Sequence, residues 1–107
     1  MIRHIVLIRF KPDLSEEEIE TVLSGIHAID GEVPGILDIT VGRSQSPEKI
    51  ERGYMHGFVV DLADWAALEA YQVHPEHKRF GASLVDNAVG GLDGILVFDL
   101  PVDRPQS

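Results

Sequence analysis

The chain has 107 residues, of which 44% are hydrophobic and 25% are charged, as expected for one globular domain. Nine Lys and Arg residues against 18 Asp and Glu give a net charge of −9, and such a surface repels nucleic-acid phosphates and anionic lipid. The chain contains no cysteine, which excludes disulfides, cysteine-based zinc sites and thiol nucleophiles.

The first ten residues are apolar, but we expect them to be a poor signal peptide. Arg3 and Arg9 interrupt them, and no small-residue cleavage site follows. No stretch of the chain reaches the roughly 18 apolar residues that cross a bilayer. We therefore expect a soluble cytoplasmic protein that binds neither nucleic acid nor membranes.

The first half of the chain predicts a strand, a helix and a second strand. Residues 2–10 are rich in β-branched side chains, and both faces of this strand are apolar at their centres. Ser15 and Glu18 have the spacing of a capping box, and apolar residues at helical spacing then continue the helix to about residues 27–29. The second strand is expected at residues 36–43.

The second half predicts two more strands separated by helical segments. A polar loop follows at residues 42–53, and the further elements are a strand at 54–62, a helix at 65–71 capped by Asp64, a helix at 75–89 and a strand at 94–100. Residues 101–107 contain two prolines and no periodicity, so we expect a domain at residues 1–100 and a C-terminal tail at 101–107.

This element order, β-α-β-β-α-β with one helical region divided in two, predicts an α+β ferredoxin-like protomer. In that fold the helices cover one face of a four-stranded antiparallel sheet. The other face would carry Ile5, Leu7 and Val59, and it would remain apolar and open. We therefore expect a homodimer in which the two sheets pack face to face.

Histidine residues are the strongest candidates for chemistry. His4 and His56 lie in the middle of strands, on faces that are otherwise apolar. Tyr71, His74 and His77 lie close together in the sequence around Pro75, and the two histidines have the i, i+3 spacing that could place them on one side of a helix start. We expect His4, His56, Tyr71 and His77 to line one cavity between the sheet and the helices.

Imidazole titrates near neutral pH and can remove a proton from a carbon acid, and a tyrosine hydroxyl can stabilise the developing enolate. His77, at a loop-to-helix junction, is the candidate general base, and Tyr71 is the candidate donor. The structural alternatives stay open: His4 and His56 as hydrogen-bonded core residues, His74 as a cap, His77 as a surface residue. Three histidines could also hold a metal, but no tight ligand motif supports one, so we expect neither metal nor cofactor.

The chain resembles the stress-responsive A/B barrel domain (Dabb) family. The resemblance covers about residues 1–100 and is carried by four segments: Met1–Phe10, Gly53–His56, Tyr71–His77 and Val97–Asp99. It implies a dimeric α/β barrel built from two ferredoxin-like protomers.

Most members of this family have no settled biochemical role, and some plant members are polyketide cyclases. By resemblance, His77 would be the base, Tyr71 would assist it, and His4 and His56 would line the cavity. His74 is a further candidate for substrate binding. Two functions follow: a dimeric small-molecule-binding protein, or a cofactor-independent cyclase, isomerase or lyase acting on a polyketide-like or aromatic carbonyl substrate.

Overall fold

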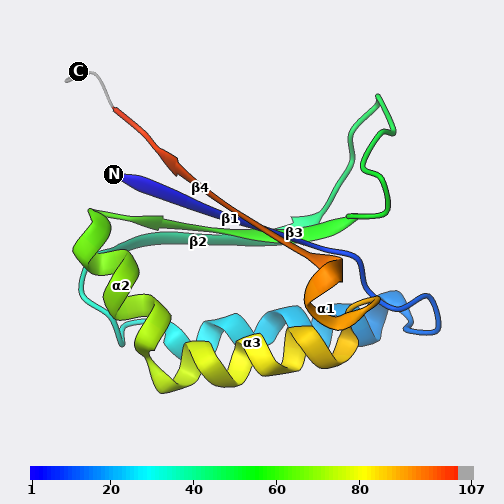
Figure 1. The fold of residues 1–107 in the computed structure, drawn as a ribbon, viewed down its shortest axis with the longest axis horizontal. Helices are drawn as coiled ribbons and strands as arrows, with labels where there is room; N and C mark the ends of the chain where they lie inside the picture. The colour runs from blue at the N-terminus through cyan, green and yellow to red at the C-terminus, as the bar shows by residue number, and fades with distance from the viewer. Residues whose placement is uncertain (104–107) are drawn as a thin grey trace.

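The computed structural model describes residues 1–103 and contains four strands, three α-helices and two short 3-10 segments (Figure 1). In chain order, they are β1 (Ile2–Ile8), α1 (Glu16–Ser24), η1 (Gly25–Ile29), β2 (Ile36–Arg43), β3 (His56–Leu62), α2 (Trp65–Val73), α3 (Pro75–Asn87), η2 (Gly91–Gly94) and β4 (Ile95–Pro101).

The strands form one antiparallel sheet in the order β2-β3-β1-β4, and the helices cover one of its faces (Figure 1). This confirms the ferredoxin-like α+β fold predicted from the sequence. The central strand β1 pairs His4 with Val60 of β3 and with Asp99 of β4.

Side-chain caps begin each of the three α-helices. Ser15 and Glu18 form the predicted capping box at α1, and the Asp64 carboxylate accepts a hydrogen bond from the Ala67 backbone N–H at α2. At α3 the Nδ1 atom of His74 accepts from the Glu76 backbone N–H, and Pro75 occupies the first turn. These caps satisfy backbone donors that the first helical turn leaves without partners.

Several element ends differ from the prediction. β1 ends at Ile8 because the Arg9 backbone bonds instead to Gly94 and Val89. Gly94 permits this contact, since a Cβ atom there would lie 2.4 Å from the Val89 carbonyl oxygen. β3 begins at His56, two residues later than predicted, because Tyr54 closes a turn with Glu51.

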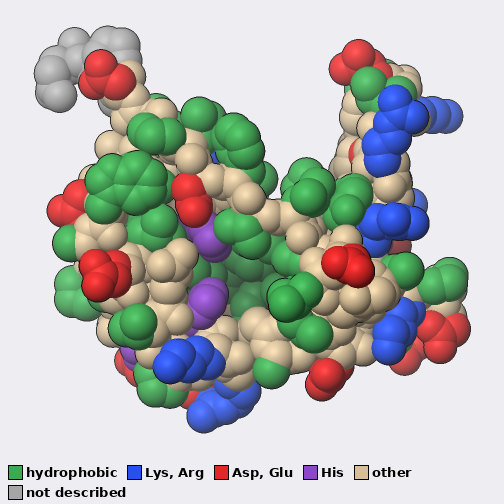
Figure 2. Space-filling model, viewed as in Figure 1, with side chains coloured by type: hydrophobic (Ala, Val, Ile, Leu, Met, Phe, Trp, Pro, Cys, Tyr) green, Lys and Arg blue, Asp and Glu red, His purple; other side chains and the backbone are tan. Residues whose placement is uncertain are grey.

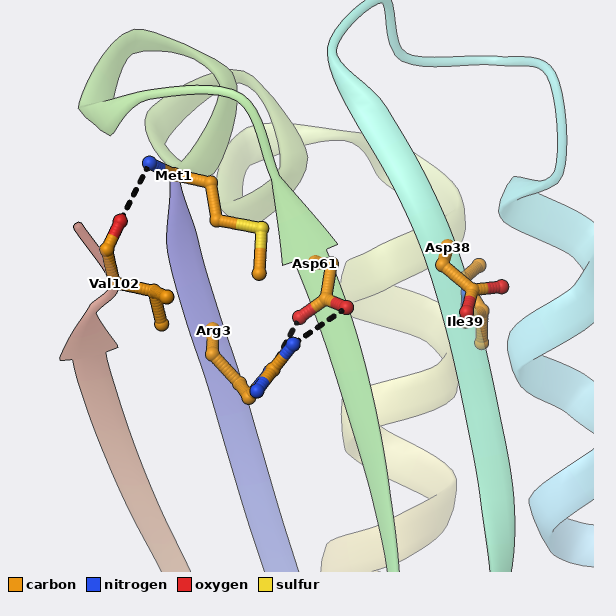
Figure 3. Close-up of polar contacts among 6 residues, drawn as sticks. All are labelled: Met1, Arg3, Asp38, Ile39, Asp61 and Val102. Atoms are coloured by element: carbon orange, nitrogen blue, oxygen red, sulfur yellow. Dashed lines mark hydrogen bonds and ion pairs between the residues drawn. The ribbon is translucent and has the colours of Figure 1, made fainter. Parts of the chain in front are cut away.

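The C-terminal strand extends into the segment that was expected to be irregular. Pro101 belongs to β4, and the backbones of Met1 and Val102 exchange two hydrogen bonds. Figure 3 shows the one that the Met1 amine donates to the Val102 carbonyl. The rest of the predicted tail, residues 104–107, lies outside the described residues. The sheet therefore continues slightly beyond the predicted domain boundary.

The two faces of the sheet differ sharply in exposure. The inner face buries alternate residues of β1 and β3 against the helices, as the alternation predicted. The outer face exposes a row of large apolar side chains on β1 and β4, namely Leu7, Leu96, Phe98 and Leu100. Arg3 and Asp61 form a salt bridge on this outer face, with 2.9 Å between Arg3 Nε and Asp61 Oδ1 (Figure 3).

Among residues 1–103, no helix has both the length and the apolar character needed to cross a bilayer.

Candidate functional site

His4 forms the centre of the site because β1 turns its side chain toward the helices. Only 4% of this residue is exposed, and its Nδ1 atom lies 2.5 Å from Oδ1 of Asp99 on the neighbouring strand β4. A carboxylate accepts hydrogen bonds, so the imidazole donates through Nδ1. The other ring nitrogen, Nε2, is then free to meet a ligand when the ring is neutral.

His77 lies in the first turn of α3, at the loop-to-helix junction predicted from the sequence. Its Nδ1 atom donates to the backbone carbonyl of Gln72 over 3.0 Å. Burial lowers the pKa of His77, and the nearby His4 lowers it further, while the bond to Gln72 opposes these effects. The lowered pKa favours the neutral form of His77, in which the unprotonated Nε2 can accept a proton.

Tyr71, on α2, packs between these two histidines. Its ring centroid lies 4.5 Å from that of His77 and 5.3 Å from that of His4. The residue is 1% exposed, and its hydroxyl makes no hydrogen bond to any of residues 1–103. Burial and the charge of Asp99 raise the pKa of Tyr71, so the hydroxyl keeps its proton and can act as a donor.

A cavity of about 410 Å³ opens beside this group, between the inner face of the sheet and α3. Figure 2 shows histidine side chains in a hollow with hydrophobic walls on this side of the molecule. Its polar side chains are those of His4, Gln72, His77 and Lys78. The apolar side chains that line it are Val6, Phe58, Phe80, Leu84, Val85, Leu92, Ile95 and Val97. An apolar cavity of this size with a few convergent polar groups suits a small organic molecule.

His56 lies away from this group, and Tyr71 is not among the residues that line the cavity, which corrects the expectation that all four polar side chains line it. It faces the helices as predicted and is 6% exposed, but it pairs with Ile8, four residues along β1 from His4. At about 3.3 Å per residue, that places the two histidines about 13 Å apart along the sheet. Strand alternation predicted the face correctly, but it carries no information about distance along the strand.

His56 instead belongs to an ionic cluster between β2, β3 and α1. Its Nε2 atom lies 2.5 Å from Glu16, whose other carboxylate oxygen lies 2.5 Å from Nη1 of Arg43. The hydrogen bond from His56 is the largest of the effects that lower the pKa of Glu16. A separate hollow of about 300 Å³ adjoins this cluster.

The remaining two histidines make local contacts. His74 caps α3 through Nδ1 and is not among the residues that line the 410 Å³ cavity, so its candidate role in substrate binding rests on the sequence alone. His27 lies beside Asp30 at the end of η1, with 3.1 Å between Nδ1 and the carboxylate. Among residues 1–103, no group of three or more His, Asp or Glu side chains is placed to hold a metal ion.

Sequence reasoning missed the acidic partners of the buried histidines. Asp99 appears in an otherwise apolar strand, which was a usable signal, but its pairing with His4 depends on the register between β1 and β4. Glu16 lies in the first turn of α1, and its contact with His56 spans 40 positions of sequence. The pairing of His4 with Asp99 and of His56 with Glu16 can therefore be identified only from the tertiary structure.

Comparison with known proteins identifies one family and several relatives that match most of the chain. The family described as "Stress responsive A/B Barrel Domain" matches residues 2–102. The stress-response A/B barrel domain-containing protein HS1 of Arabidopsis thaliana is 29% identical over 98 residues, covering 92% of this chain and 86% of that protein. Olivetolic acid cyclase of Cannabis sativa is 24% identical over 80 residues, covering 75% of this chain and 79% of the cyclase.

Comparison with solved structures identifies the same ferredoxin-like fold. A crystal structure from Jannaschia sp. CCS1, described as a dimeric ferredoxin-like protein of unknown function, superimposes with a TM-score of 0.86 at 34% identity. The match covers 94% of this chain and 98% of that one.

Proposed function

The chain belongs to the stress responsive A/B barrel domain family, and from this membership and the geometry of the site we propose that it is a homodimer that binds a small organic molecule. The ligand is largely apolar and carries a carbonyl or hydroxyl oxygen. It occupies the cavity beside His4, Tyr71 and His77.

The observation that carries this proposal is the buried hydroxyl of Tyr71. A buried hydroxyl without a partner costs about 1–3 kcal/mol, so a folded domain tends to avoid one. The Tyr71 ring packs against two histidines that both line the cavity, although Tyr71 itself is not among the lining residues, and the raised pKa of its hydroxyl keeps it a donor. A ligand oxygen would give it the acceptor that it lacks among residues 1–103.

The homodimer is supported by the outer face of the sheet. Four large apolar side chains are between 37% and 60% exposed there, namely Leu7, Leu96, Phe98 and Leu100. Side chains of this type are usually buried in folded proteins. The Jannaschia relative with this fold is described as dimeric. A second copy packed against this face would cover these side chains.

A second candidate function is cofactor-independent catalysis, and the state of His77 favours it. Its Nε2 lone pair could remove a proton from a carbon next to a carbonyl group, which leaves an enolate on the substrate and an imidazolium on His77. Tyr71 would donate a hydrogen bond to the enolate oxygen, and the His4–Asp99 pair would orient the substrate. The relationship to a protein named olivetolic acid cyclase supports this class of chemistry.

Binding is tested with paired probes that differ only in their oxygen. Ligand-observed NMR compares acetophenone with ethylbenzene, and Tyr71→Phe should weaken the ketone by roughly 5–10-fold while leaving the hydrocarbon unchanged. Tyr54→Phe is the matched control, because Tyr54 lies on the loop between β2 and β3. Equal loss for both probes, or no binding of either, would contradict the proposal.

Catalysis is tested by exchange of the acetophenone methyl protons for deuterium. His77→Ala should slow the protein-dependent exchange by about 10²–10⁴-fold, while His27→Ala should leave it unchanged. If the wild-type protein binds the ketone but does not accelerate exchange, the binding function stands and this second candidate fails.

A further inference from the structure

The wall of the 410 Å³ cavity contains one Lys side chain and no Arg, that of Lys78 on α3. The other wall residues are His4, Gln72, His77, one glycine and apolar residues, so no Asp or Glu lies among the described residues that line it. Lys78 is also exposed, which places its ammonium group where the cavity meets solvent. Figure 2 shows Lys or Arg side chains beside the hollow that contains the histidines. The mouth of the cavity therefore carries a positive charge.

Lys78 has no anionic partner in the described part of the chain. Arg79, the next residue, forms a salt bridge with Glu76. Lys78 forms no salt bridge with any of residues 1–103. A helix brings residues three and four positions apart together, and for Lys78 these are His74, Pro75, Gly81 and Ala82. None of them is acidic, so the ammonium group is available to a ligand.

Gly81 leaves space beside Lys78. It lines the same cavity, three positions further along α3, so the two residues lie on one face of the helix. Its φ is not positive, and a Cβ atom there would meet nothing within 4 Å, so neither the backbone nor a neighbour requires glycine. Alanine would favour the helix more strongly than glycine does. What glycine provides at this position is open space next to the lysine.

We propose, on the basis of the binding function proposed above, that the ligand is a keto acid with an apolar body and that Lys78 binds its carboxylate at the mouth of the cavity. The carbonyl end of the ligand lies toward Tyr71, and the apolar body contacts the hydrophobic wall. Lys78 is thus a specificity-determining residue that selects acids over neutral ketones of the same shape.

A single ammonium group suits a carboxylate better than a phosphate. A phosphate monoester carries nearly two negative charges at neutral pH and offers three acceptor oxygens, so it is usually bound by several donors. The neighbouring Arg79 is paired with Glu76 and is not part of the wall. The net charge of −9 further disfavours a polyanionic ligand.

The inference is tested with two ketones that differ only in charge, 4-acetylbenzoate and 4-acetylbenzamide. Their dissociation constants are compared by ligand-observed NMR. The wild-type protein should bind the acid roughly 5-fold more tightly than the amide, as expected for an ion pair that remains partly exposed. High salt should reduce this preference, because it screens the exposed charge, and should leave binding of the amide unchanged.

Substitutions at residue 78 show whether the preference comes from the lysine. Lys78→Gln should weaken the acid roughly 5-fold and leave the amide unchanged, whereas Lys78→Arg should keep the preference because it keeps the charge. Lys11→Gln is the matched control: it changes the net charge by the same amount, but Lys11 is not among the residues that line the cavity.

The outcomes separate this inference from the binding function itself. Equal binding of acid and amide by the wild type, a preference that survives in Lys78→Gln, or a preference that Lys11→Gln removes equally well overturns the role of Lys78. The binding function still stands in those cases if Tyr71→Phe weakens binding of the amide. If the wild-type protein binds none of the acid, the amide and acetophenone, both proposals fail.

Discussion

Replacing Tyr71 with phenylalanine should stabilise the free protein even though it removes a polar group from the ligand site. The tyrosine hydroxyl is fully buried and bonds to none of residues 1–103, while its ring packs against His4 and His77. Phenylalanine keeps the ring and deletes only the oxygen. The substitution therefore removes a desolvation cost without losing a hydrogen bond.

The expected gain is about 1 kcal/mol, at the low end of the cost of an unpaired buried hydroxyl. For a domain of 107 residues, this corresponds to a rise in Tm of about 4–8 °C. Chemical denaturation at equal protein concentration is the assay, because the stability of a dimer depends on concentration. Tyr54→Phe serves as the control: it removes a hydroxyl placed 3.4 Å from the Asp93 carbonyl and should be neutral or slightly destabilising.

The sign of this change distinguishes two explanations of Tyr71. A residue kept for stability loses stability when its hydroxyl is deleted, whereas a residue kept for a ligand loses affinity and gains stability. A loss of 1 kcal/mol or more in Tyr71→Phe without ligand would refute the reasoning, since it would mean that the hydroxyl already has a partner in the free protein.

Three other substitutions test the interface, the titration of His77 and the capping of α1. Leu7→Asp should convert the dimer to a monomer at micromolar concentration in analytical ultracentrifugation, because it buries an unpaired charge at the interface; an intact dimer would exclude this face. The pKa of His77 is lowered in the folded state, so its contribution to stability is present above about pH 6.5 and is lost as pH falls toward the folded pKa. His77→Gln should therefore lose less stability than wild type between pH 7 and 5.5 in urea denaturation, and an equal loss would contradict the burial of His77. Ser15→Ala should cost about 1 kcal/mol in the same assay by breaking the capping box at α1, whereas an unchanged midpoint would show that the cap is dispensable.

Local chemistry explains why most of the fold could be predicted from the sequence. Alternation placed His4 and His56 on the helix-covered face, and Ser15 and Asp64 marked helix starts that the structure confirms. Element ends were less predictable where partners distant in sequence decide them. The end of β1 at Ile8, for example, depends on the approach of Gly94.

The candidate site was predictable only in part for the same reason. His4, Tyr71 and His77 come together because α2 and α3 lie over β1, an arrangement that follows from the ferredoxin-like order. The separation of His56 and the pairing of His4 with Asp99 depend on strand register, which the sequence pattern does not specify. Register is thus the information that the structure adds.

The most direct test of the binding proposal is a crystal structure of the protein soaked with acetophenone. The account predicts the ligand in the cavity beside His4 and His77, with its carbonyl oxygen within hydrogen-bond distance of the Tyr71 hydroxyl. A ketone bound only elsewhere, with the Tyr71 hydroxyl still without an acceptor, would contradict it.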